Sequence, residues 1–205
     1  MFFMKFIGKI LLIVGVLAAI LWGVDVWMDR QLLSEELIRL HVVANSDTQE
    51  DQDLKLQVRD AIAEYLQENL PQNASKEETM AFLSMRIPEL TETANRTLEE
   101  TGSTDRAVVT LTREPFPKRL YESFALPAGV YDSLRIHIGQ AQGQNWWCVV
   151  FPSLCLPAAG EEEQEVGVTF DEPLAGALEG EKPYQVRFFL LDCLGWLQNF
   201  FYQFS

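Results

Sequence analysis

The most informative stretch of the chain is Gly139-Gln-Ala-Gln-Gly-Gln-Asn-Trp-Trp-Cys-Val-Val-Phe-Pro-Ser-Leu-Cys155. A polar loop that contains glycine leads into an apolar run with two adjacent tryptophans. If residues Asn145 to Phe151 form a strand, their side chains alternate between its two faces. One face then carries Trp146, Cys148 and Val150, and the other carries Trp147, Val149 and Phe151. Because both faces are apolar, the strand is either buried on both sides or keeps one face for a partner.

Four further segments have the composition of strands. Branched apolar residues dominate the first of them, which we expect to be central in a sheet. The four segments are Leu37 to Ala44, Asp105 to Arg113, Leu120 to Leu126 and Ser133 to Ile138. The loop from Gly139 to Gln144 is short enough to join the last of these to the tryptophan strand, so we expect a hairpin there.

Helical spacing of apolar residues marks the segments between the strands. Residues 48–69 form the first predicted helix, for which Ser46 and Gln49 fit a capping box. Ser75 and Glu78 fit the same pattern and open a second helical segment that runs to Glu100, and Pro88 either kinks this segment or divides it. The prediction is a single α+β domain with a mostly antiparallel sheet of about five strands, covered by two or three helices in the order β-α-α-β-β-β-β-α.

The two ends of the chain differ from this domain in composition. Residues 157–183 contain a glutamate-rich run and read as an acidic flexible insert, and residues 184–205 hold an apolar helix from Tyr184 to Phe201. We therefore expect four parts, which are a signal or anchor at 1–30, the α+β domain at 31–156, the insert and the final helix. Core packing, membrane contact and partner docking all remain open for that helix.

The charge of the chain argues against nucleic acid as a partner. The sequence has 30 acidic and 16 basic residues, a net charge of −14, which repels phosphate backbones.

The N-terminus resembles an export signal. Lys5 and Lys9 precede an uncharged run from Ile10 to Val24 that ends at Asp25. At 1.5 Å per residue this run spans about 22 Å, which is short of the roughly 30 Å hydrocarbon core of a bilayer. Both a cleaved signal and a permanent anchor are open. Since no good cleavage site follows the run, we favour an anchor with the rest of the chain outside the cytoplasm.

The sequence shows no recognisable catalytic or metal-binding set. His41 and His137 both lie in predicted strands without a third ligand at useful spacing, and the common hydrolase, phosphate-loop and dinucleotide motifs are absent. We therefore predict no catalytic residues, no metal, no cofactor and no small-molecule substrate. Cys148 and Cys155 are candidates for a disulfide across a short loop, with two buried thiols as the alternative. A cysteine-dependent enzyme built on Cys155 and a histidine is a second hypothesis, and an envelope scaffold based on the aromatic final helix is a third.

Several of these motifs together resemble the stage II sporulation protein R family. The resemblance covers roughly residues 37–155 and rests on motifs in a fixed order. These are Leu37-Ile-Arg-Leu-His-Val-Val-Ala-Asn-Ser-Asp47, Asp51-Gln-x-Leu-Lys-Leu-Gln-Val-Arg-Asp60, Leu126-Pro-Ala-Gly-Val-Tyr131, Leu134-Arg135, Ile138-Gly139 and Asn145-Trp-Trp-Cys-Val-Val-Phe-Pro-Ser-Leu-Cys155.

The resemblance implies an exported signalling protein of endospore-forming bacteria. Such a protein is made in the forespore and crosses into the space between the two membranes. There it activates a membrane-embedded aspartic protease of the mother cell, which cleaves the sigma-E precursor. On this interpretation the chain is not an enzyme, and the candidate contact residues are Asn145, Trp146 and Trp147, since tryptophan is favoured at interface hot spots. Arg39 and Arg135 could pair with carboxylates on neighbouring strands, so structure explains them equally well.

Overall fold

The helices of the domain lie together in the chain between its first strand and its other strands. The computed structural model describes residues 15–17, 21, 23–24, 34–71, 73–120, 125–152, 199–200 and 202. A strand β1 (Ile38–Val43) is followed by three helices, α2 (Gln49–Asn69), α3 (Lys76–Met85) and α4 (Ile87–Glu100). Five strands complete the order, namely β2 (Ala107–Phe116), β3 (Arg119–Leu120), β4 (Ala125–Leu126), β5 (Gly129–Ile138) and β6 (Asn145–Phe151). The predicted α+β class is confirmed.

Within the described residues, the main sheet has four strands in the order β2-β5-β1-β6. β1 runs parallel to β5 and antiparallel to β6, and β2 runs antiparallel to β5, while β3 and β4 pair separately as a short ribbon. Two of the three pairings in the main sheet are therefore antiparallel, as predicted, and the first strand is central, also as predicted.

The predicted hairpin between Ser133–Ile138 and the tryptophan strand is wrong. β1 lies between β5 and β6, so these two strands are not neighbours. The loop that joins them passes over the end of β1 and is therefore not a hairpin turn between paired strands. Its backbone bonds to that end, with Gln142 N–H donating to the Asn45 carbonyl at 3.1 Å and Gly143 N–H donating to the Ala44 carbonyl at 2.9 Å.

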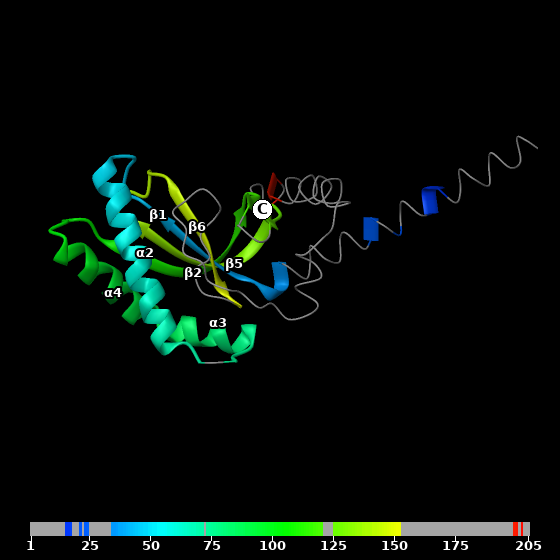
Figure 1. The fold of residues 1–205 in the computed structure, drawn as a ribbon, viewed down its shortest axis with the longest axis horizontal. Coiled ribbons are helices and arrows are strands. Elements are labelled where there is room, and N and C mark those ends of the chain that lie inside the picture. Colours follow the sequence, from blue (N-terminus) through cyan, green and yellow to red (C-terminus); the bar gives the residue numbers. More distant parts are fainter. Residues whose placement is uncertain are drawn as a thin grey trace, which may run out of the picture.

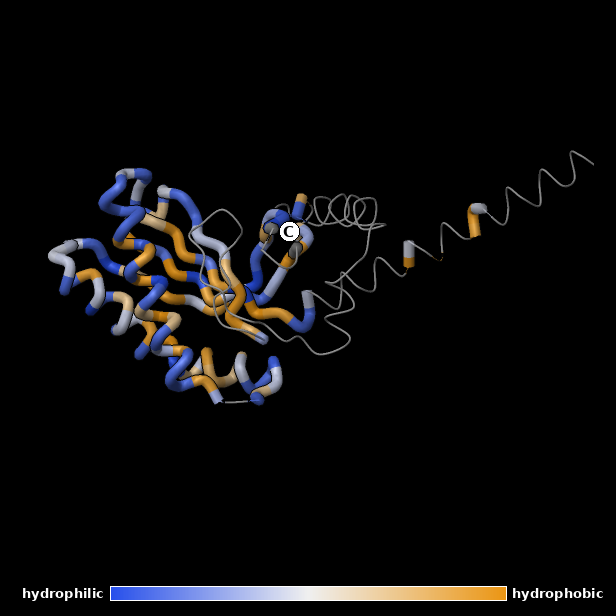
Figure 2. Tube along the Cα trace, in the orientation of Figure 1, coloured by the Kyte–Doolittle hydropathy of each residue, from blue (hydrophilic) through white to orange (hydrophobic). Residues whose placement is uncertain are grey.

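The three helices lie on one side of the sheet (Figure 1). Their apolar residues meet one face of the strands in a single core, and Figure 2 shows apolar residues along the strands and in patches on the helices. β1 contributes Ile38, Leu40 and Val42 to this core, and α2 contributes Leu54, Val58, Ile62 and Leu66. The sheet is thus covered by helices on one face only among the described elements.

Helix caps follow the sequence with one difference. The capping box of Ser75 and Glu78 is confirmed by reciprocal bonds of 3.2 and 2.8 Å. The capping box predicted for Ser46 and Gln49 is wrong, because α2 begins later and Thr48 is its cap, accepting from the Asp51 N–H.

The second helical segment divides in two, as one alternative predicted. α3 ends at Met85 and α4 begins at Ile87. Pro88 lies in the first turn of α4, where the missing proline N–H costs no helical hydrogen bond.

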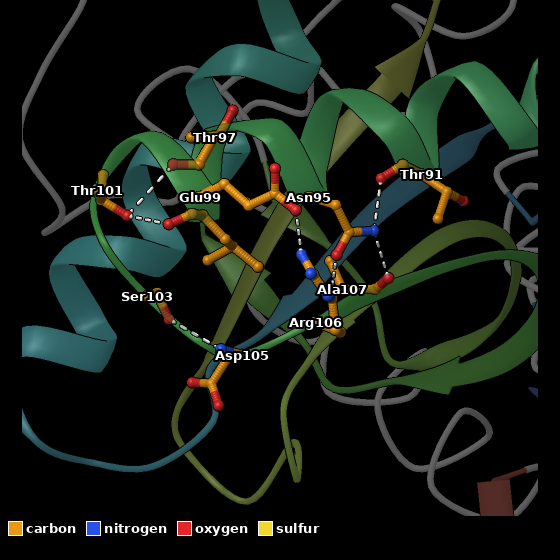
Figure 3. A network of polar contacts seen from close by, with 10 residues as sticks. Thr91, Asn95, Thr97, Glu99, Thr101, Ser103, Asp105, Arg106 and Ala107 are labelled. Atoms are coloured by element: carbon orange, nitrogen blue, oxygen red, sulfur yellow. Dashed lines mark hydrogen bonds and ion pairs between the residues drawn. The ribbon is translucent and has the colours of Figure 1, made fainter.

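The side chain of Asn95 joins α4 to β2 (Figure 3). Its amide nitrogen donates to the Ala107 carbonyl at 3.0 Å and to the Thr91 carbonyl at 2.8 Å, and its oxygen accepts from the Ala107 N–H at 2.9 Å. An ion pair between Arg106 and Glu99 lies beside it. This side chain therefore fixes where the chain leaves the helix layer and enters the sheet.

Several predictions fall on parts of the chain outside the described residues. The acidic insert lies wholly there, and so does the final helix except for residues 199–200 and 202. The four-part division of the chain and the export signal stay predictions. Among the residues that are described, no helix is long and apolar enough to cross a membrane.

Candidate functional site

The sheet face opposite the helices, called here the outer face, combines aromatic and ionisable side chains. The even-numbered β1 residues Ile38, Leu40 and Val42 belong to the helix-side core, so Arg39 and His41 point to the other side. In the strand register His41 lies beside Arg135 of β5 and Trp147 of β6. Three strands therefore bring their polar or aromatic side chains to one place on this face.

Trp147 lies at the centre of an aromatic cluster on the outer face. Its ring stacks on the His41 ring with centroids 3.9 Å apart and an interplanar angle of 17°. The Phe116 ring meets it edge-on at 4.7 Å, and the Arg119 guanidinium lies 5.6 Å from its centroid. Such ring pairs add stabilisation of about 0.5–1.5 kcal/mol beyond area burial. Trp147 is consequently 9% exposed.

Arg39 extends the same cluster. The arginine is fully buried, and its guanidinium carbon lies 4.1 Å from the Phe116 centroid and 5.2 Å from that of Tyr131. Guanidinium over an aromatic ring is a favourable cation–π contact, which gains strength when water is excluded. The Tyr131 hydroxyl donates to the Pro127 carbonyl at 2.8 Å, which fixes that ring in turn.

A chain of polar contacts runs beneath Trp147. His41 Nδ1 lies 3.2 Å from Glu114 Oε1, and His41 Nε2 lies 2.7 Å from Asn145 Oδ1. Arg135 Nη1 approaches the second oxygen of Glu114 at 3.3 Å. The suggestion that Arg135 pairs with a carboxylate on a neighbouring strand is thus confirmed. The network connects β2, β5, β1 and β6, so it ties the position of Asn145 to the whole width of the sheet.

The electrostatics of this network favour an ionised Glu114. Burial by itself raises the pKa of the Glu114 carboxyl, but hydrogen bonding and charge from His41, with the charge of Arg135, outweigh it and leave the pKa below its ordinary 4.5. Burial lowers the pKa of nearby His137 below 6.5, and the charges of Arg135 and His41 lower it further. The carboxylate therefore acts as the counter-charge of the site.

The two tryptophans predicted to contact a partner lie on opposite faces. Trp146 belongs to the helix-side core with Cys148 and Val150, as the alternation predicted, and the Arg59 guanidinium lies 4.0 Å from its centroid. Trp146 is 6% exposed and Trp147 is 9% exposed, so both tryptophan side chains are buried, whereas Asn145 is exposed. Partner binding by these residues stays a prediction.

A second hydrogen-bonded cluster holds the loop before β6. Asn45 Oδ1 accepts from the Gln140 N–H at 2.9 Å, and Asn45 Nδ2 donates to Asp51 Oδ2 at 3.1 Å. The same carboxylate oxygen accepts from the Ser46 hydroxyl at 2.5 Å, and this bond is the main reason that the pKa of Asp51 is lowered. Asn45 is therefore a clamp between the loop and α2.

Two glycines allow the loop to approach this clamp. Gly139 has φ +55°, a left-handed conformation that favours glycine, and a β-carbon there would lie 2.3 Å from Asn45 Oδ1. A β-carbon on Gly143 would lie 2.1 Å from the Ser46 carbonyl oxygen. The first and last motifs of the sequence thus meet at the N-terminus of α2.

Comparison with known proteins places these motifs in one family. The family model described as stage II sporulation protein R matches residues 34–161, more than half of the chain. The chain belongs to the stage II sporulation protein R family. A curated relative, stage II sporulation protein R of Bacillus subtilis (strain 168), is 36% identical over 125 residues, which are 61% of this chain and 56% of that relative. The match thus spans little more than half of the relative's length. No solved structure matches the chain.

Family membership gives the protein a role related to sporulation. The family name denotes a sporulation protein and no catalytic activity. The matched residues include every strand and helix from β1 to β6, so the family-defining part of the chain is the folded domain itself.

The cysteine and histidine predictions have different outcomes. The two histidines do meet on neighbouring strands, with ring centroids 6.5 Å apart, but the described part of the chain contains no group of three residues that could hold a metal ion. The Cys148 side chain lies in the helix-side core, on the face opposite His41. Cys155 lies outside the described residues, so the disulfide stays a prediction.

Sequence reasoning missed Glu114 as a member of the site. The available signal was a charged residue between the end of the predicted strand at Arg113 and Pro115. Its partners come from other strands, and only the strand order brings them together.

Proposed function

We propose that this protein is an exported sporulation signal that activates a membrane-embedded aspartic protease of the mother cell, so that the sigma-E precursor is processed. The single observation that supports it is the family match over residues 34–161, the whole of the folded domain. The export segment at the N-terminus would carry this domain from the forespore into the space between the two membranes.

The protein would act through its surface and not through chemistry of its own. Three ionisable residues of the outer face are engaged with one another, since Glu114 contacts both His41 and Arg135. An ordered network of this kind fixes the shape of a sheet and is typical of a binding surface that is formed before the partner arrives. Asn145, exposed at the start of β6, is then the side chain in this network best placed to meet the protease.

Deleting the gene in the sporulating host should leave the sigma-E precursor uncut, as measured by immunoblotting at the stage of septation. Expression of the full chain in the forespore should restore cleavage. A variant lacking residues 1–30 is the matched control for export, because it keeps the folded domain and should not restore cleavage. Normal processing in the deletion strain would refute the proposed function, and full rescue by the truncated variant would refute the export step.

A further inference from the structure

The exposed side chain of Asn145 is held by a buried histidine, and this contact decides which of its atoms a partner meets. Asn145 is the first residue of β6 and is exposed, whereas His41 is only 7% exposed. His41 Nε2 lies 2.7 Å from Asn145 Oδ1. An amide has an oxygen that accepts hydrogen bonds and a nitrogen that donates them. The proton on His41 Nε2 therefore determines which end of the amide faces inward.

The contacts of both ring nitrogens indicate the protonation of His41. Nδ1 lies 3.2 Å from Glu114 Oε1, and an ionised carboxylate can only accept, so Nδ1 carries a proton. Nε2 faces the Asn145 oxygen, which also accepts, so Nε2 donates as well. The ring is therefore a cation between two acceptors. Loss of the Nε2 proton would turn this nitrogen into an acceptor and would favour the opposite orientation of the amide.

The ionisable groups that lie around His41 in the described part of the chain come from four strands. They are Arg39 of β1, Glu114 of β2, Arg135 and His137 of β5, and Arg119 of β3, which lies over the Trp147 ring. One of these five groups is a carboxylate, and the others are cations or can become cations. The surroundings of His41 therefore favour an anionic acceptor over a neutral one.

The donors of this network reach the surface, while its acceptors lie inside. The Arg135 side chain is 33% exposed. His137 is half-buried, and Val43 of β1 is paired with it on one side and with Asn145 on the other. The acceptors point inward, because Glu114 is buried and the Asn145 oxygen faces the histidine of β1. A partner at this end of the outer face therefore meets N–H groups.

We infer that doubly protonated His41 positions Asn145 so that its amide nitrogen donates to an acidic side chain of the partner protein, beside Arg135 and His137. This inference rests on the proposed function, and it names the chemical group by which the protease is held. His41 is a positioning residue, since it acts on the partner through Asn145. A carboxylate fits better than a neutral carbonyl, because a hydrogen bond to an ionised acceptor is about twice as strong.

Nitrogen-15 NMR of the full-length protein in detergent micelles tests the positioning step without the protease. At pH 6 both ring nitrogens of His41 should have the chemical shifts of N–H groups. Where a higher pH removes the proton from Nε2, the side-chain amide of Asn145 should shift in the same titration. The chain has two histidines, so His137→Gln leaves only His41 and should show the same response.

Binding to the purified protease in the same micelles at pH 6 tests the contact itself. Asn145→Asp keeps the size of the side chain and its bond to His41 but replaces the donor with an acceptor. Affinity should fall by at least about tenfold, the value of one hydrogen bond to a charged group. Gln142→Glu adds the same charge at an exposed position of the same loop and should weaken binding far less. Wild-type affinity should also fall where Nε2 loses its proton.

The NMR measurement can refute the inference by itself. An unprotonated Nε2 at pH 6 would overturn it, and so would an Asn145 amide that does not respond when that proton leaves. Loss of the response in His137→Gln would also overturn it, because the response would then belong to the other histidine.

The binding measurement separates the inference from the proposed function. Wild-type affinity in Asn145→Asp, or equal losses in Asn145→Asp and Gln142→Glu, would refute the contact while the proposed function stands. Wild-type affinity that persists after the Nε2 proton is lost would refute the role of His41. Absence of any binding by the wild-type protein, in a host where the gene is needed for cleavage, would refute direct contact with the protease and the inference with it.

Discussion

Replacing Gly143 with alanine should destabilise the protein by about 3–4 kcal/mol, and the structure gives the reason. The added β-carbon would lie 2.1 Å from the Ser46 carbonyl oxygen, 2.5 Å from the Ser46 carbonyl carbon and 2.9 Å from the Ala44 β-carbon. Two of these atoms are backbone, so no flexible side chain can move aside. The loop would have to withdraw by more than about 1 Å to restore ordinary contact distances.

That withdrawal would break the bonds that close the loop over β1. The donors are the N–H groups of Gly143 and Gln142, at 2.9 and 3.1 Å from the carbonyls of Ala44 and Asn45. Each such bond contributes about 1 kcal/mol net, and the crowding that remains adds about 1–2 kcal/mol. Urea unfolding followed by tryptophan fluorescence measures the sum.

Gly102 provides the matched control. It has φ +80°, and a β-carbon added there would meet nothing within 4 Å, so Gly102→Ala should cost only the backbone strain of about 1 kcal/mol. If Gly143→Ala unfolds at the same urea concentration as the wild type, or loses no more than Gly102→Ala, the close approach of loop and turn is not what constrains this position.

Three further predictions concern the polar contacts. Glu114→Gln should lower stability by about 1–3 kcal/mol at pH 7. Because the pKa of Glu114 is lowered in the folded state, its contribution to stability is present above pH 4.5 and is lost as the pH falls below that value. In urea titrations the stability of the variant should therefore fall less steeply at acid pH than that of the wild type, and an equal fall would contradict the role of Glu114. Because the pKa of His137 is lowered in the folded state, the unfolded chain takes up a proton at a higher pH than the folded one, so wild-type stability should decline as the pH drops through about 6.5. His137→Gln should remove this decline. If the stability of the variant declines as steeply with pH, His137 is not the cause. Asn95→Ala should lower stability by about 1–3 kcal/mol in thermal unfolding, because it removes the partner of both backbone groups of Ala107. Asn69→Ala is the control, because the exposed Asn69 side chain bonds only within its own helix. Equal losses in the two variants would show that the link from Asn95 to β2 adds no stability.

The helix boundaries could be predicted from the sequence where they depend on residues that lie close together in the chain. Capping at Ser75 and the break at Pro88 depend on residues within one turn of each other, so short-range pattern was enough to place α3 and α4. The cap of α2 was placed wrongly because Ser46 and Thr48 both offer a hydroxyl. The choice between them depends on Asp51 and on the loop that packs against Asn45.

The candidate site was predictable only in part. The tryptophans, Asn145 and the two histidines could be singled out by type, and the alternation in β6 correctly separated Trp146 from Trp147. Their neighbours could not be named. The contacts of His41 with Glu114 and Asn145 join residues 73 and 104 positions apart, and no local pattern encodes such pairings.

The sequence by itself determined the family, the α+β class and the placement of Trp146 and Trp147 on opposite faces of their strand, because these depend on residue type and short periodicity. Only the tertiary structure decided that β1 lies between β5 and β6, and with it which strands are edges and which side chains meet on the outer face. The physical reason is that a strand's alternation fixes the face it presents but not the neighbour it pairs with. That choice is made by long-range contacts, here by a loop whose glycines let it close over the end of β1.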